Sequence, residues 1–243
     1  MSDQAHGETK ERAATGGTGV ANWEPSSVNV RTIARALLNV GIGVPESVPS
    51  NVARLAVALY QDLSTGSPLS PTRFESLTAA SGVAVDVLRT AGGRWLEFDG
   101  AGSLTGFGGL TLRPTRHRLV LDERHFYLWC ALDGFLVAHA LGRPVRIETQ
   151  CPTTGAGIEV AASRERVEHF EPGDAVMSVV VPESDAACSV SDTRRGFCEY
   201  VNFYRSKQVV VGSLTRPDAD VLTMDDAFAL AGLLTLPLRN ARI

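Results

Sequence analysis

The chain has 243 residues, 44% of them hydrophobic and 21% charged, a composition typical of a globular protein with one large domain or two small ones. Its formal net charge of −4 argues against a general nucleic-acid binder, because phosphate affinity depends on clustered Lys and Arg. No apolar run reaches the roughly 18 residues of a membrane span, and no secretory signal pattern is present, so we expect a cytoplasmic protein without membrane or nucleic-acid partners.

The first part of the chain is expected to divide into an extension and a helical unit. Residues 1–27 combine Gly, Thr, Ala, Ser and charge with almost no large apolar side chains, so they are predicted to be disordered. The following residues show apolar side chains at helical spacing, which predicts amphipathic helices around residues 33–38 and 52–60. Ser70 before Pro71 has the form of an N-cap followed by proline at the first helical position, and it predicts a third helix.

A short helix over residues 83–88 and then a β-hairpin should complete this unit. The apolar period drops toward two at residues 95–98, and the turn-forming residues 99–102 follow. Helices followed by a hairpin predict a winged-helix-like unit over residues 28–112. The third helix offers chiefly Arg73 as a basic residue, too little charge for reading DNA, so a scaffold or lid role is favoured.

Residues 113–243 are predicted to form a catalytic α+β domain with a mixed, mostly antiparallel β core. A strand over residues 118–121 should run into a central helix, within the apolar segment 125–141, that carries Cys130 and Asp133. Short antiparallel strands fit the remaining pattern better than βαβ units do. The other expected elements are strands over residues 145–149, 158–161, 176–181, 197–204 and 209–211, and a closing helix capped by Thr223.

Cys130 and Asp133 are the first candidates for chemistry. They are three residues apart, and in a helix this spacing places the thiol and the carboxylate on one face. A carboxylate among apolar neighbours is costly to bury unless it is paired or protonated, and such groups are often functional. The alternative is structural, because a lone cysteine on an apolar segment is most often a small core residue.

The remaining cysteines do not indicate a disulfide framework or a zinc site. A chain of this length without a signal peptide does not need disulfides, so reduced thiols are expected. The sequence contains no C-x-x-C pair, and no histidine has a spacing to the cysteines that suggests structural zinc. Cys188, in a polar stretch, is interpreted as a surface thiol.

Several blocks, taken in order, resemble the organomercurial (alkylmercury) lyases of bacterial mercury resistance. The most specific are W-C-A-L-D at residues 129–133 and F-C at residues 197–198. The likeness runs from about residue 98 to residue 239. The supporting matches are Gly106-Phe107-Gly108, Leu110-Thr111-Leu112-Arg113, Tyr127-Leu128, Cys151 with Thr154-Gly155, and Val201 with Phe203.

The resemblance implies that Cys130, Asp133 and Cys198 cleave a carbon–mercury bond and hold the mercury. Thiolates suit a soft metal, and a carboxylic acid can protonate the departing carbon. No cofactor is implied, since mercury is itself substrate and product, and the expected acceptor of Hg(II) is a mercuric reductase or a small thiol. Trp129 is interpreted as lining the pocket for the organic group, or alternatively as a core aromatic. Cys151 is interpreted as a structural thiol.

Two other classes of function stay open from the residues. A mercury-binding sensor or transcription regulator without lyase activity would use the same thiols, but it would not need Asp133 as a proton donor. A thiol–disulfide oxidoreductase would pair Cys130 with Cys198, although that chemistry favours a C-x-x-C arrangement. Release of hydrocarbon from an organomercurial distinguishes the three.

Overall fold

The computed structural model describes residues 29–85, 88, 93–182, 189–213, 216 and 219–241. The predicted extension, Cys188 and part of the short helix expected over residues 83–88 lie outside the described residues. Within these ranges, no helix has the length and apolar character needed to cross a membrane.

An antiparallel sheet of eight strands forms the centre of the described fold, in the order β1-β2-β3-β5-β4-β6-β7-β8, and a smaller sheet has the order β10-β9-β11. This arrangement, together with its helices, confirms the α+β class and the mostly antiparallel core. The strands are β1 Leu96–Phe98, β2 Leu104–Phe107, β3 Leu110–Thr111, β4 His117–Leu121, β5 Arg124–Leu128, β6 Val145–Gln150, β7 Gly157–Ala162, β8 Val167–Glu171, β9 Val176–Val179, β10 Phe203–Tyr204 and β11 Asp220–Leu222.

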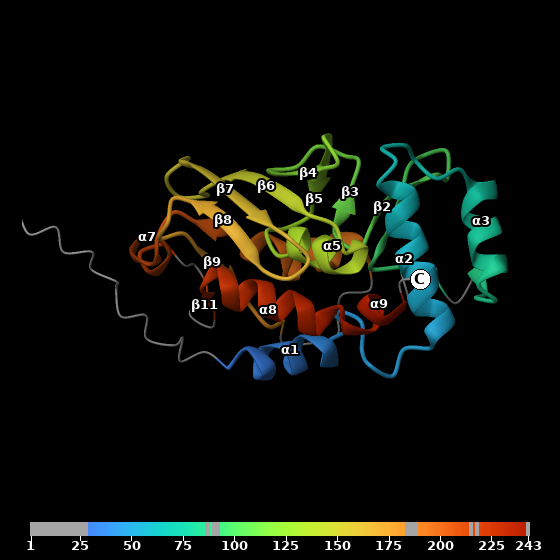
Figure 1. Ribbon diagram of the computed structural model, residues 1–243, viewed down its shortest axis with the longest axis horizontal. Coiled ribbons are helices and arrows are strands. Elements are labelled where there is room, and N and C mark those ends of the chain that lie inside the picture. The colour runs from blue at the N-terminus through green and yellow to red at the C-terminus, as the bar shows by residue number, and fades with distance from the viewer. Residues whose placement is uncertain are drawn as a thin grey trace, which may run out of the picture.

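The helices lie on one side and at one end of the large sheet. Figure 1 shows α5 and α8 below the sheet, α1 below α8, and α2 and α3 at the end where β2 lies. Apolar side chains between these layers form one continuous core. The helices are α1 Val30–Asn39, α2 Ser50–Leu63, α3 Pro71–Ala80, α5 Asp133–Leu141, α6 Val190–Gly196, α7 Lys207–Val211, α8 Met224–Leu234 and α9 Leu236–Ala241, with a 3₁₀ turn η1 at Cys198–Tyr200.

Helix caps confirm several predicted boundaries. The Ser70 side chain accepts a hydrogen bond from the N–H of Arg73, and Pro71 is the first residue of α3. The Thr223 side chain accepts from the N–H of Asp226 at the start of α8. The left-handed Gly142, at φ 66°, ends α5.

The predicted hairpin is present, but it continues into the large sheet. β1 pairs with β2 across a turn in which the Asp99 carboxylate accepts from the N–H groups of Ala101 and Ser103. β2 then pairs with β3, and β3 with β5, so the sheet passes without a break across residues 112 and 113. A winged-helix arrangement is therefore not confirmed.

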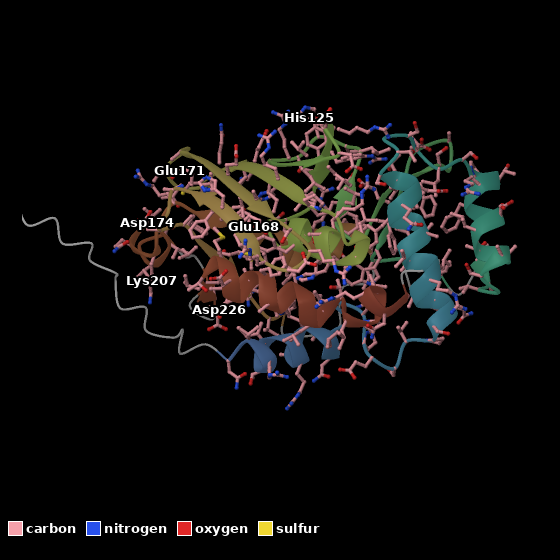
Figure 2. All side chains as sticks on the ribbon, viewed as in Figure 1. His125, Glu168, Glu171, Asp174, Lys207 and Asp226 are labelled. Carbon is pink, nitrogen blue, oxygen red and sulfur yellow. The ribbon has the colours of Figure 1, made fainter. Side chains whose placement is uncertain are left out.

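The prediction of one helix within residues 125–141 is wrong in its first part. Residues Arg124–Leu128 form β5, which pairs with β4 across a turn at Asp122 and Glu123, both at positive φ. Phe126 and Leu128 are buried, whereas the His125 side chain is exposed at the outer rim of the sheet (Figure 2). This alternation belongs to a strand. The helix begins only at Asp133.

Two predicted strands near the C-terminus are also corrected. Within residues 197–204, only Phe203–Tyr204 is a strand, and Cys198–Tyr200 is a 3₁₀ turn. Residues 209–211 lie in the helix α7 because the Ser206 side chain caps it, accepting from the N–H of Val209. A cap outweighs the β preference of three valines there. The strands predicted near residues 145–149, 158–161 and 176–181 are confirmed as β6, β7 and β9.

Candidate active site

Cys130, Asp133 and Cys198 meet in one buried cluster. One carboxylate oxygen of Asp133 and the two sulfur atoms all lie within 4.8 Å of one another. The exposed fractions are 0% for Cys130, 4% for Asp133 and 5% for Cys198. Three groups able to bind a metal ion are therefore held together away from bulk water, although Cys198 lies 65 positions after Asp133 in the sequence.

The turn before α5 fixes the first two members of the cluster. Cys130 lies in a bend just before the helix, and its N–H donates to Oδ2 of Asp133 over 2.7 Å. Asp133 is the first residue of α5, where a carboxylate also interacts favourably with the helix dipole. The expectation that both residues share a helix face is therefore corrected, because a hydrogen-bonded turn places them together.

The third member arrives on η1, which is fastened to the turn before α5. The N–H of Ala131, the residue after Cys130, donates to the carbonyl of Val201, the residue after η1, over 3.1 Å. On the other side, the Ser178 hydroxyl donates to the carbonyl of Tyr200 over 2.6 Å and ties η1 to β9. Cys198 is thus positioned by the small sheet and Cys130 by the large one.

Burial controls the proton affinities in the cluster. It raises the pKa of Asp133 to about 7, while hydrogen bonds from Cys130 and the positive charge of Arg194 oppose part of that rise. Burial, a hydrogen bond with Cys198 and the charge of Asp133 raise the pKa of the Cys130 thiol. At neutral pH the resting cluster therefore holds a proton on Cys130 and has a carboxyl group able to exchange one.

The raised pKa of Asp133 predicts a stability change with pH. The folded carboxyl keeps its proton up to about pH 7, whereas the unfolded one releases it near pH 4. The folded state therefore binds more protons between these values, and the free energy of unfolding should fall as pH rises through this window, by about 4 kcal/mol at most. Urea unfolding at pH 5, 6, 7 and 8 measures this change, which Asp133→Asn should flatten. Asp225→Asn, at an exposed position, should leave the change in unfolding free energy with pH as it is in the unsubstituted chain.

Gly109 makes room for the Asp133 carboxylate. Its carbonyl accepts from the N–H of Trp129 over 2.9 Å, and its backbone has a φ of +95°. A Cβ at this position would collide with the carboxyl carbon of Asp133. The turn between β2 and β3 therefore packs its backbone directly onto the cluster.

Gly109→Ala is expected to destabilise the protein and disturb the cluster. The positive φ alone costs on the order of 1–3 kcal/mol, and the collision with Asp133 adds a cost of similar size. Gly66→Ala is the matched control, because Gly66 has φ +87° and no atom lies within 4 Å of an added Cβ. Urea unfolding of both variants measures the difference, and equal losses would show that Gly109 does not restrict the space around Asp133.

A buried carboxylate that the sequence analysis missed supports Trp129. Glu97 is 7% exposed, and its Oε2 accepts from the Thr111 hydroxyl (2.6 Å) and from Nε1 of Trp129 (3.3 Å). Its Oε1 lies 3.5 Å from the guanidinium of Arg113 and 3.8 Å from that of Arg194. Glu97 thus connects the strand beside the cluster with the helix α6 that precedes Cys198.

One signal in the sequence could have revealed Glu97. Gly106 faces Glu97 across the β1–β2 pair, and a Cβ on Gly106 would press against the Glu97 carboxylate. A glycine within a strand often marks such a close approach.

Cys151 stands apart from the cluster, in a turn after β6. The N–H of Cys151 donates to the carbonyl of Ala156. The carbonyl of Cys151 accepts a hydrogen bond from the N–H of Gly155. Burial raises the pKa of its thiol, but hydrogen bonds from the Thr154 side chain and from the backbone at Thr153, Thr154 and Arg205 outweigh that effect, so the pKa is lowered. These contacts place Cys151 in its turn and outside the cluster.

Comparison with known proteins places these residues in a family context. A family model described as alkylmercury lyase matches residues 110–235. An alkylmercury lyase of Pseudomonas putida is 32% identical over 188 residues, covering 76% of this chain and 85% of that protein. The alkylmercury lyase of Staphylococcus epidermidis is 35% identical, covering 66% of this chain and 73% of that protein. The one of Streptomyces lividans is 33% identical, covering 73% of this chain and 80% of that protein.

A solved structure shares the fold. It is described as the mercury-bound form of MerB2, has a TM-score of 0.64, and covers 86% of this chain and 98% of its own. Its sequence identity of 18% means that this likeness concerns the fold alone. The family match itself spans the cluster, since Cys130, Asp133 and Cys198 all fall within residues 110–235.

Proposed function

Because the chain belongs to the alkylmercury lyase family, we propose that it cleaves the carbon–mercury bond of organomercurials with Cys130, Asp133 and Cys198 as the reacting side chains. One observation carries this assignment of roles: two sulfur atoms and a carboxylate oxygen lie within 4.8 Å of one another in a buried site. A soft metal needs the sulfurs, and the departing carbon needs a proton from a group within hydrogen-bond reach.

The proposed reaction balances with the groups present. The Asp133 carboxylate accepts the proton of the Cys130 thiol, and the thiolate bonds to mercury. The Cys198 thiol then gives up its proton and bonds to the same mercury atom. One of the two protons passes from Asp133 to the carbon as the carbon–mercury bond breaks. The other leaves with the ligand that mercury carried on entry. The products are a hydrocarbon and Hg(II) held by two thiolates, and the cycle uses no resident cofactor.

The pKa of Asp133 suits this double role. A group that accepts a proton and later returns it works best when its pKa lies near the working pH. Burial raises the pKa of the Asp133 carboxyl to about 7, far above the usual pKa of an aspartate. Cys130 needs such a base, because burial raises the pKa of its own thiol.

The remaining roles follow from contacts around the cluster. We propose that Trp129, held by Glu97, lines the space for the organic group, and that Cys151 stabilises its turn. We also propose that α1–α3 with the β1–β2 hairpin act as a winged-helix-like scaffold over residues 28–112, with the difference that this hairpin continues into the large sheet. Hg(II) would then pass to a mercuric reductase or a small thiol.

A test of the activity is the release of hydrocarbon from an organomercurial by the purified full-length chain. Methane from methylmercury, or benzene from phenylmercury, should appear in proportion to the protein in a single turnover. Stoichiometric mercury binding without hydrocarbon release would instead support the alternative of a mercury sensor.

A further inference from the structure

The turn that packs on Asp133 is held by a side chain from the helical unit. Gly108 and Gly109 are the two central residues of the β2–β3 hairpin, and both have positive φ, +54° and +95°. Hairpin turns of two residues often require such values, which glycine adopts without strain. The hydroxyl of Tyr60, in α2, donates to the carbonyl of Gly108 over 2.7 Å. Figure 1 shows α2 beside β2, at the end of the large sheet where this turn lies.

The turn has close contacts on both of its sides. A Cβ on Gly108 would collide with the Tyr60 hydroxyl, and a Cβ on Gly109 would collide with the Asp133 carboxyl. Tyr60 is only 3% exposed, and burial, followed by the charge of Asp133, raises the pKa of its hydroxyl. Two residues of backbone therefore separate the tyrosine from the reacting acid, and a movement of the turn changes the space that the carboxyl occupies.

We propose that Tyr60 is a positioning residue for Asp133 and acts through the turn Gly108–Gly109. The proposal rests on the proposed function and adds a role for α2 to it. Proton transfer to the departing carbon requires a carboxyl group within hydrogen-bond reach, and a misplacement of about 1 Å can cost roughly 100-fold in rate. Since α2 lies outside the residues 110–235 that match the family model, a segment beyond that match would contribute to the reaction.

The hydrogen bond acts where packing alone leaves the tyrosine free to move. The ring of Tyr60 meets the ring of Phe107 edge to face, with centroids 4.9 Å apart. It also borders a cavity of about 440 Å³, so neighbouring atoms do not fix it on that side. The turn makes two further bonds, from the Gly108 N–H to the carbonyl of Trp95 and from the Trp129 N–H to the carbonyl of Gly109. Of these three bonds, the one from the tyrosine is made by a side chain, so one substitution removes it.

Tyr60→Phe keeps the ring and removes the donor to the Gly108 carbonyl. The maximal single-turnover rate of hydrocarbon release should fall about 10- to 100-fold, as is typical when a group that orients a reacting side chain is lost. The protein concentration that gives half of this rate should stay within about threefold, because the turn separates Tyr60 from the reacting atoms. The variant should still retain one Hg(II) per molecule when Hg(II) is supplied directly.

Two further variants separate positioning from stability. Thr78→Val is the matched control, because Thr78 is 1% exposed and its hydroxyl donates to the carbonyl of Glu75 over 2.8 Å, within α3. It also loses a buried hydroxyl bond, but it should cleave within about twofold of the unsubstituted chain per folded molecule, with the folded fraction taken from urea unfolding. Replacement of Tyr60 by p-aminophenylalanine keeps an N–H donor on the ring and should restore the rate to within about threefold.

A double substitution tests the route through the turn. Gly108→Ala should slow cleavage by its collision with the Tyr60 hydroxyl. In the Tyr60→Phe background the colliding oxygen is absent, so the added loss should be smaller by about threefold or more. Gly82→Ala is the matched control, because Gly82 has φ +64° and no atom lies within 4 Å of an added Cβ. It should slow cleavage in neither background.

Amide exchange of Trp129 gives a readout that needs no mercury. Its N–H is bonded to Gly109, so Tyr60→Phe should speed its exchange about 3- to 10-fold relative to the amides of β6, and Thr78→Val should not. Unchanged exchange would overturn the proposal. So would a Tyr60→Phe rate equal to that of the unsubstituted chain, no rescue by p-aminophenylalanine, or independent losses in the double variant. Absence of hydrocarbon release from the unsubstituted chain would instead overturn the proposed lyase function.

Discussion

Cys130→Ser and Cys198→Ser are each expected to lower carbon–mercury cleavage by a factor on the order of 10⁴ or more. Both sulfurs point into one cluster, and a serine oxygen is a hard ligand that does not replace a thiolate on mercury. The serine hydroxyl is also far less acidic than a thiol, so Asp133 could not take its proton. Single-turnover release of methane or benzene, with protein in excess over the organomercurial, measures the loss directly.

Cys151→Ala is the control for the loss of a thiol as such. Cys151 is buried like the other two, but it belongs to the turn after β6 and not to the cluster. Its removal should leave single-turnover cleavage within a few-fold of the unsubstituted chain in the folded fraction. Full activity in Cys198→Ser would show that one thiolate suffices and that the two-sulfur scheme is wrong.

Asp133→Asn should separate mercury binding from cleavage. The asparagine oxygen can still accept from the N–H of Cys130, so the turn before α5 keeps its shape. The amide cannot accept and return a proton, and removal of a general acid typically costs about 10²- to 10⁴-fold in rate. Hydrocarbon release should fall by that factor, while the chain still retains one Hg(II) per molecule when Hg(II) is supplied directly.

Asp133→Ala provides the comparison for shape. If the loss reflects proton transfer, Ala and Asn should slow cleavage to a similar degree, although Ala also removes the acceptor for Cys130 and should lower stability more. Cleavage by Asp133→Asn at the rate of the unsubstituted chain would mean that the proton comes from water or a thiol, and that Asp133 only shapes the turn.

The cluster was predictable because short blocks of sequence carry it. The W-C-A-L-D block at residues 129–133 and the F-C pair at residues 197–198 identify all three side chains without any knowledge of the fold. The local structure around Cys130 was predicted wrongly, since an apolar run such as residues 126–132 fits a helix or a buried strand equally well. The pairing of β5 with β4 decides between them, and a single segment does not reveal its partner strand.

Glu97 could not be predicted as part of the site, because its partners are distant in the sequence. A glutamate in a short strand predicts an exposed side chain, because nothing nearby in sequence indicates a partner. Its partners Trp129 and Arg194 come from segments about 30 and 100 residues later and meet it only in the folded chain. By contrast, the helix caps at Ser70 and Thr223 were predicted correctly because a cap depends on three or four consecutive residues.

The segments that carry Cys130 and Cys198 are tied to different sheets, so a metal atom bound by both thiolates would have a mechanical effect on the chain. Cys130 is held by the large sheet and Cys198 by the small one, so a mercury atom shared between them cross-links the chain across about 70 residues. By the chain-entropy estimate for a covalent link, closing a loop of that length restricts the unfolded chain by about 4 kcal/mol. The product complex should therefore be harder to unfold than the empty enzyme, and an acceptor that removes Hg(II) must act on the more rigid form.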